Sequence, residues 1–170
     1  MTTFTITHVI LSLVGIGTGF AVAMGLLGAK RFERLTLVFL GTTVLTGVTG
    51  FLSPFHKFLP SYGVGIVSLI VLEVAIVALY VRHLSGAWRR TYAISAMIAL
   101  YLNFFVLIAQ LFLKVTALKD LGPTQSEFPF ILAQLVALGF FTLLTVFAAI
   151  RFGAKPVTTL PVHVEAARAA

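Results

Sequence analysis

The sequence predicts an all-α membrane protein, a polytopic bundle of five transmembrane helices. Hydrophobic residues make up 59% of the 170 residues, charged residues make up 10%, and the mean hydropathy of +1.08 is too high for a soluble surface. Five apolar stretches reach the roughly 17 to 25 residues that a spanning helix needs. They are residues 5–27, 36–55, 61–81, 92–115 and 128–150. We expect a transmembrane domain over residues 1–151 and a flexible cytoplasmic tail over residues 152–170.

Basic residues favour one side of these spans. Nine of the twelve lie after the first, third or fifth span, and three lie on the other side. Since cytoplasmic loops carry an excess of Lys and Arg, the N-terminus is predicted outside and the C-terminus in the cytoplasm. The net charge of +7 then reflects topology and attraction to anionic lipid headgroups, and no nucleic-acid partner is needed to explain it.

The first two spans carry glycines and hydroxyls, which favour close helix packing. No Lys or Arg precedes the first apolar run, so this helix is expected to be retained and not cleaved as a signal peptide. His8 and His56 lie at the outer ends of the two spans, at similar membrane height. A haem held by this pair, a shared metal or a quinone is therefore an alternative hypothesis. The chain has no cysteine, which excludes thiolate metal sites and cysteine nucleophiles.

The third span contains one carboxylate, Glu73, within the otherwise uncharged residues 64–81. A charge at that depth costs at least about 2.5 to 3.5 kcal/mol unless it is neutralised or paired. We therefore expect Glu73 to face the bundle interior. At helical pitch Tyr62 and Tyr80 fall on the same stripe as Glu73.

The fourth and fifth spans each place polar residues on one face. The fourth carries a stripe with small residues between the polar ones, and we expect this stripe to face inward: Tyr92, Ala96, Ala99, Asn103, Gln110 and Lys114. The fifth repeats the pattern with Glu127, Gln134 and Thr145. Counted from the outer ends, Glu73 and Asn103 lie about 20 Å deep, and Gln110 and Gln134 about 9 Å deep. The predicted ligand site thus has two layers. The alternative is that a protonated Glu73 and the amides only tie helices together.

The outer loop at residues 119–127 has two interpretations. It could cap a site above Gln110 and Gln134. Alternatively, it is a Gly-Pro turn followed by an N-cap at Ser126, with Glu127 near the positive end of the helix dipole.

The stretches ALYLNFFVLIAQ (residues 99–110) and PTQSE (residues 123–127) resemble a group of uncharacterised, small, multi-pass proteins of bacterial inner membranes. The resemblance covers most of the spanning region and implies the same location for this chain. It brings no established activity, cofactor or site residues. The b-type cytochrome bundles differ, because their paired intrahelical histidines are missing here.

Three hypotheses on function follow. The first is binding or passage of a small ligand, proton or cation at a polar site between the third, fourth and fifth spans. The second is a redox protein that holds haem or quinone. The third is an accessory subunit whose polar faces meet another membrane protein or a second copy of the chain. The spacings of hydrolase and ATPase motifs are missing, so the sequence does not indicate an ordinary enzyme of either kind.

Overall fold

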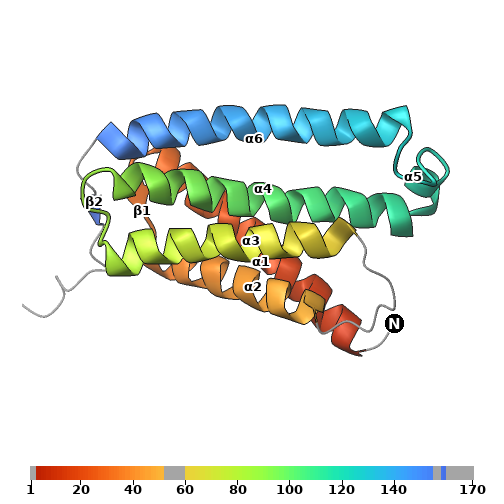
Figure 1. Ribbon diagram of the computed structural model, residues 1–170, viewed down its shortest axis with the longest axis horizontal. Coiled ribbons are helices and arrows are strands. Elements are labelled where there is room, and N and C mark those ends of the chain that lie inside the picture. The colour runs from red at the N-terminus through yellow and green to blue at the C-terminus, as the bar shows by residue number, and fades with distance from the viewer. Residues whose placement is uncertain (1–2, 52–59, 155–157, 160–170) are drawn as a thin grey trace, which may run out of the picture.

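The computed structural model describes residues 3–51, 60–154 and 158–159, and this part of the chain is mainly helical (Figure 1). The helices in chain order are α1 (Thr3–Leu27), α2 (Glu33–Phe51), α3 (Pro60–Ile76), the π-helical turn η1 (Val77–Val81), α4 (Trp88–Lys114), the short α5 (Thr116–Lys119) and α6 (Phe128–Ala154). The two-residue strands β1 (Lys30–Arg31) and β2 (Thr158–Thr159) pair in parallel. The helical class is confirmed. α6 extends three residues beyond the predicted end of the transmembrane domain, and most of the predicted tail lies outside the described residues.

Four segments are long and apolar enough to cross a membrane. They are Ile6–Leu27, Gly63–Val81, Trp88–Lys114 and Phe128–Ala154, with mean hydropathies between 2.1 and 2.7. They correspond to the first, third, fourth and fifth predicted spans. α2, the predicted second span, does not belong to this set, because Glu33 and Arg34 stand at its start and threonines and glycines dilute its apolar residues. Residues 52–55 of that predicted span lie outside the described part.

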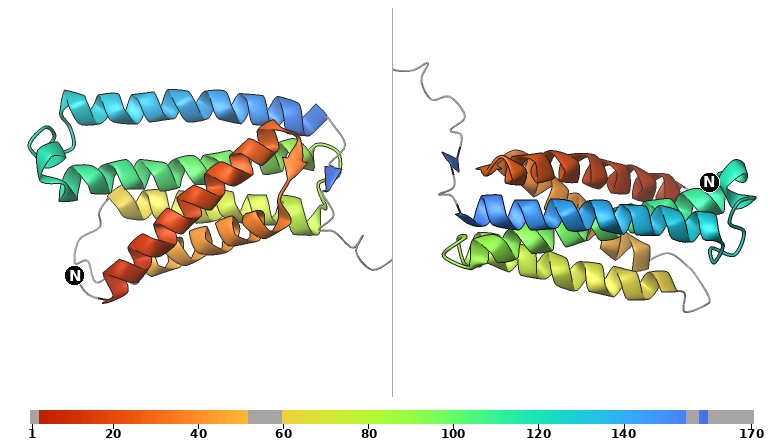
Figure 2. Two further views of the ribbon diagram at one scale, coloured as in Figure 1. Left: turned by 180° about the vertical axis from the view of Figure 1, so that it is seen from behind. Right: turned by 90° about the horizontal axis from the view of Figure 1, so that it is seen from above.

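α4 is the central helix of the bundle. It packs against α6, α3 and α1, while α2 packs against α1 and α3. Figure 2 shows α1 crossing the other helices obliquely and α6 lying along α4. Each long helix therefore has at least one neighbour, and α4 separates α3 from α6.

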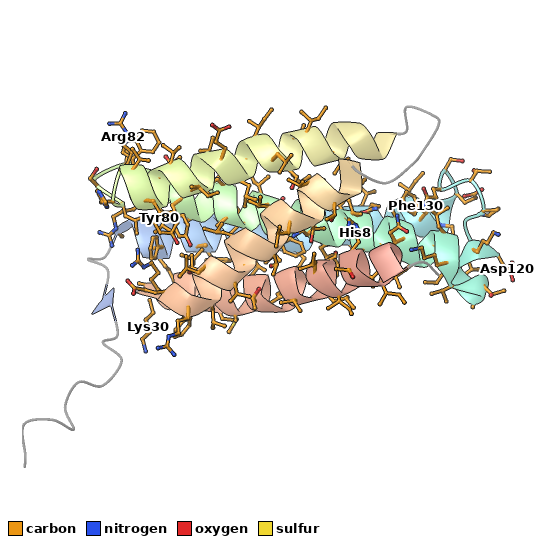
Figure 3. All side chains as sticks on the ribbon, turned by 90° about the horizontal axis from the view of Figure 1, so that it is seen from below. His8, Lys30, Tyr80, Arg82, Asp120 and Phe130 are labelled. Atoms are coloured by element: carbon orange, nitrogen blue, oxygen red, sulfur yellow. The ribbon has the colours of Figure 1, made fainter. Side chains whose placement is uncertain are left out.

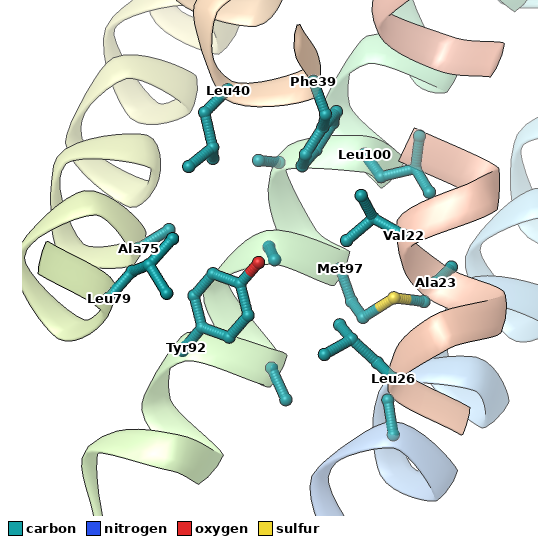
Figure 4. Packing of buried hydrophobic residues seen from close by; sticks show 14 of the residues in the cluster. Val22, Ala23, Leu26, Phe39, Leu40, Ala75, Leu79, Tyr92, Met97 and Leu100 are labelled. Atoms are coloured by element: carbon teal, nitrogen blue, oxygen red, sulfur yellow. The ribbon is translucent and has the colours of Figure 1, made fainter. Parts of the chain in front are cut away.

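Small residues on α4 let its neighbours approach closely. Ala93, Ala96 and Ala99 are fully buried, and larger side chains fill the space beside them. Figure 4 shows Tyr92 of α4 reaching between α3 and α1, next to Met97. Interfaces of this kind depend on van der Waals contact between closely spaced backbones, because lipid is as apolar as the side chains it would replace.

α6 is attached along a single face. Its buried residues recur at spacings typical of one helical stripe: Gln134, Ala137, Phe141, Ala148 and Phe152. Phe141 lies 5.8 Å from Phe20 of α1 and 5.4 Å from Phe104 of α4, measured between ring centroids. The remaining surface of α6 is exposed and apolar. This surface fits a hydrocarbon environment far better than water.

Charges are distributed unevenly between the two ends of the bundle. Seven cations lie at the end where α1 and α6 finish and α2 and α4 begin: Lys30, Arg31, Arg34, Arg82, Arg89, Arg90 and Arg151. We call this the basic end. Figure 3 shows Lys30 and Arg82 there, with Asp120 at the opposite end. For the described residues, the predicted grouping of basic residues on one side is confirmed.

The connection from α3 to α4 is wound differently from the helices that it joins. In η1 the Arg82 N–H donates to the Val77 carbonyl at 2.9 Å, five residues back. His83 and Leu84 follow with φ angles of 48° and 55°, and Leu84 is nevertheless buried. Left-handed backbone is costly for leucine, so packing of its side chain holds this turn in place.

Gly19 offers a direct test of the close approach between α1 and its neighbours. A Cβ atom at Gly19 would lie 2.5 Å from Leu100 Cδ1 and 2.9 Å from Phe39 Cε2. Gly17, on the same helix, is exposed and has nothing within 4 Å of that position. We expect Gly19→Leu to lower the free energy of unfolding by about 1 to 3 kcal/mol or more through overpacking. Gly17→Leu is the matched control and should change it little. Thermal unfolding in mild detergent measures both variants, and equal losses would contradict the packing described here.

Candidate functional site

Glu73 lies on the outside of the bundle. It is ten residues after Gly63 and eight before Val81, near the middle of this apolar segment, and its side chain is exposed. α3 instead turns Leu72, Ala75 and Ala78 toward its neighbours. Among the described residues Glu73 has no hydrogen-bond or ion-pair partner. The expectation that Glu73 faces the bundle interior is therefore wrong.

The outer face of α3 and η1 carries a regular stripe. Its members are spaced alternately three and four residues apart and are exposed, except for the half-buried Val77: Gly63, Ile66, Ile70, Glu73, Val77 and Tyr80. We call this set the Glu73 stripe. Tyr80 shares the face of Glu73 as expected, whereas the side chain of Tyr62 lies outside the described residues. A 3-4 spacing is the pattern by which one helix packs along another.

Asn103 is buried on a different side of the bundle. Its Nδ2 donates to Thr43 Oγ1 at 3.1 Å, which joins α4 to α2. Gly15 of α1 lies beside this bond, since a Cβ added there would be 3.8 Å from Asn103 Nδ2. The inward stripe predicted on α4 is thus correct for Asn103, but the expected layer of Glu73 with Asn103 is not formed.

The second predicted layer is also arranged differently. Gln110 is exposed, and Lys114 beyond it is exposed as well. Gln134 is buried and its Nε2 donates to the Phe105 carbonyl at 3.3 Å, which joins α6 to α4. Phe105 stands five residues before Gln110, which is about 7 to 8 Å along the helix. Gln134 therefore lies deeper than expected, relative to α4.

A loop residue that the sequence analysis passed over makes a similar contact. Gln125 Nε2 donates to the Ala109 carbonyl at 2.7 Å, one turn above Phe105. Two glutamine amides thus bind α4 carbonyls four residues apart. The φ angle of 60° at Gln125, three residues before α6, turns the loop back toward α4, and the sequence carries no signal for it because glutamine rarely adopts this backbone conformation.

His8 is half-buried and belongs to the contact between α1 and α2. Its Nδ1 lies 2.8 Å from Thr49 Oγ1. His56, the second residue of the proposed haem or metal pair, lies outside the described residues. Within the described ranges no group of three or more metal-ligating residues of the His, Cys, Asp and Glu types occurs.

A cavity of about 240 Å³ lies between α4 and α6. It is lined by Ile98, Tyr101, Leu138, Phe141, Thr142, Thr145 and Val146. The hydroxyls of Thr142 and Thr145 donate to carbonyls of their own helix, at 2.7 and 2.6 Å. The cavity therefore offers mainly apolar surface and suits a lipid chain better than a polar ligand.

Comparisons of the chain with protein-family models, with curated proteins and with solved structures found no match. Functional inference therefore rests on the geometry above.

The contact between Asn103 and Thr43 is testable by a double-mutant cycle. We expect Asn103→Ala and Thr43→Ala to show a coupling free energy of about 0.6 to 1.7 kcal/mol, the range found for interhelical hydrogen bonds in membranes. Unfolding in mixed detergent micelles is the measurement. A cycle of Asn103→Ala with Thr49→Ala is the control, because Thr49 contacts His8 instead. Coupling of the control pair as large as that of the test pair would contradict the assignment.

The outer loop is held by Glu127. The Ser126 side chain, which one of the two interpretations made an N-cap, contacts the Thr124 hydroxyl, and α6 begins two residues later at Phe128. The Glu127 carboxylate accepts hydrogen bonds from the Thr124 hydroxyl at 2.8 Å and from the N–H groups of Thr124 and Ser126, each at 3.1 Å. The Thr124 hydroxyl is the main cause that lowers the pKa of Glu127 from its ordinary value of 4.5. The loop is stabilised while this carboxylate is ionised.

The sign of the pH dependence follows from the lowered pKa. The stabilisation of the folded state by Glu127 should be complete when the pH is above the pKa of this carboxyl group in the unfolded chain. It should disappear as the pH falls through the lower pKa of the folded state. The melting temperature of the wild type should exceed that of Glu127→Gln at a pH of about 6, and the difference should vanish at a pH of about 2.5. A difference that does not change with pH would show that the carboxylate charge plays no part.

Proposed function

We propose that the protein is a subunit of a membrane complex and that the Glu73 stripe binds a neighbouring transmembrane helix. The observation that carries this proposal is the exposed carboxylate of Glu73 in the middle of an apolar segment. A charged group facing lipid there would cost at least about 2.5 to 3.5 kcal/mol. A donor or cation on a neighbouring helix at the same depth removes that cost.

The residues around Glu73 support a helix as the partner. Ile66 and Ile70 are 47% and 56% exposed and stand two turns and one turn before Glu73, respectively, on the same stripe. An apolar seam with a single polar member is the pattern in which the polar residue fixes register and the apolar residues supply packing. The partner is therefore expected to present an apolar stripe with one hydrogen-bond donor or cation opposite Glu73.

The membrane setting is part of the proposal. We infer five spans with α2 as the second, because α2 begins at the basic end and its contact with Asn103 lies well inside the bundle. Its 19 residues extend about 28 Å, close to the thickness of the hydrocarbon core. The basic end would then be cytoplasmic and the N-terminus outside, in a bacterial inner membrane as the resemblance implies.

The two other hypotheses have less support. A ligand, proton or cation site between the third, fourth and fifth spans would need Glu73, Asn103 and Gln134 to converge. Instead, Glu73 is exposed on the outer face of α3, Asn103 bonds to Thr43 of α2, and Gln134 bonds to the Phe105 carbonyl of α4. For haem or quinone, His8 is the one predicted ligand within the described residues, and it already contacts Thr49.

Site-specific photocrosslinking in native membranes tests the proposal. A benzophenone amino acid is placed at Ile70 on the Glu73 stripe, and the matched control is placed at Leu135, which is 58% exposed on α6. We expect a discrete protein adduct from position 70 and little from position 135. The adduct should become several-fold weaker with Glu73→Leu and persist with Glu73→Gln, because an amide still donates and accepts hydrogen bonds.

The size of the adduct identifies the partner. Twice the mass of the chain indicates a second copy, and another mass indicates a different subunit. Equal adducts from the two positions, or an adduct that Glu73→Leu leaves unchanged, would overturn the proposal.

A further inference from the structure

The basic end carries an excess of buried donors without partners. Seven buried side-chain polar atoms lack a hydrogen-bond partner in the described part of the chain, and five of them belong to four residues at this end. These residues are Arg31, Thr36, Arg89 and Tyr92. Buried donors are paired in the great majority of native structures, so such a concentration calls for a partner that is not a side chain described here.

Arg89 carries two of these atoms, Nε and Nη2. Its guanidinium carbon lies 5.7 Å from the ring centroid of Phe152, which is itself fully buried. The Tyr92 ring also contacts Phe152, with the two ring centroids 5.9 Å apart. The Arg89 guanidinium thus packs against one aromatic ring, while the N–H groups on its Nε and Nη2 have no acceptor among the described residues.

Among the described residues, no carboxylate at this end is free to serve as that acceptor. Glu33 is the one acidic residue at the basic end within the described ranges, and it is paired with Arg31. Arg31 keeps an unpartnered, buried Nε and lies close enough to Tyr92 to act on it electrostatically. The hydroxyls of Tyr92 and Thr36 lie near one another but do not meet hydrogen-bond geometry. Within the described residues, the positive charge at this end is thus compensated only by Glu33, which pairs with Arg31.

The start of α4 adds to this field. Ala87 precedes the helix and provides no side-chain cap. The N–H groups of Trp88 and Arg89 donate to the Ser85 and Gly86 carbonyls, at 3.0 and 3.4 Å, so the start of this helix contributes the positive end of its dipole near Arg89 but not these two donors. Planar guanidinium donors together with a helix N-terminus are the chemistry that recognises phosphate oxygens.

From this arrangement we propose that the basic end binds a phosphate group, with Arg89 as its principal ligand and Arg31 as a second cation. The phosphate belongs either to the headgroup of an anionic lipid or to free phosphate. In the membrane orientation inferred above, this end lies at the level of headgroups. The site itself depends on the positions of Arg89 and Arg31 and is independent of the Glu73 stripe.

The test uses the purified full-length protein and two separate ligands. In neutral detergent, inorganic phosphate is titrated and the melting temperature is followed. In nanodiscs, phosphatidylglycerol is titrated into phosphatidylcholine and bound lipids are counted by native mass spectrometry. Stabilisation in the first experiment indicates free phosphate, and selective retention of phosphatidylglycerol in the second indicates a lipid headgroup.

Two variants and one control separate a site from general attraction between charges. Arg89→Gln should weaken binding of the effective ligand about tenfold, as expected for the loss of a charge-assisted hydrogen bond. Arg89→Lys keeps the charge but loses the planar fork, so it should bind with intermediate affinity and remain folded. Arg34→Gln removes an exposed cation of the same end and should change binding less than about twofold.

Two results would overturn the proposal. Equal losses in Arg89→Gln and Arg34→Gln would show diffuse electrostatic attraction without a site. The lack of any effect of either phosphate or phosphatidylglycerol on the wild-type protein would show that the donors of Arg89 are satisfied by water.

Discussion

The structure depends on one constraint, that polar groups within a hydrocarbon layer must find partners inside the protein. The side-chain nitrogens of Asn103, Gln134 and His8 meet it by bonding across helices, to Thr43, to the Phe105 carbonyl and to Thr49. Several threonines meet it by donating to carbonyls one turn back on their own helices. Glu73, a charged group in the middle of an apolar segment, has no such partner among the described residues. This is why we propose that its partner belongs to another chain.

α4 is the helix through which most of these partners are reached. Asn103 extends from it toward α2, and the carbonyls of Phe105 and Ala109 accept amides from α6 and from the outer loop. The same helix supplies the buried alanines that allow close contact. Internal polar contacts and close packing therefore reinforce each other, because Asn103 shares a buried face of α4 with Ala96 and Ala99. The outer face of α3 takes no part in these contacts and stays exposed.

Composition and hydropathy were sufficient to predict the helical class and four helices long and apolar enough to cross a membrane, because both depend on local sequence alone. They also placed Asn103 and the alanines of α4 on one buried face, since small and polar residues alternate there at helical spacing. They failed for Glu73, because α3 is apolar on all sides and gives no indication of which side meets its neighbours. The depth of Gln134 was misjudged because residues had been counted inward from the outer end of each span as if both ends lay at the same level, whereas the loop between them folds back through Gln125. The phosphate site was not foreseen, because unpaired donors on Arg89 appear only when α4 and α6 are placed side by side.

The π-helical turn at the end of α3 separates the outer face of that helix from the basic end. A turn with hydrogen bonds five residues back holds more residues in the same length than an α-helical turn does. A single-residue deletion within Val77–Val81 can therefore be absorbed by rewinding this turn into α-helix, without rotating the residues before it. The loss of one residue from this turn would therefore leave the direction of Glu73 unchanged.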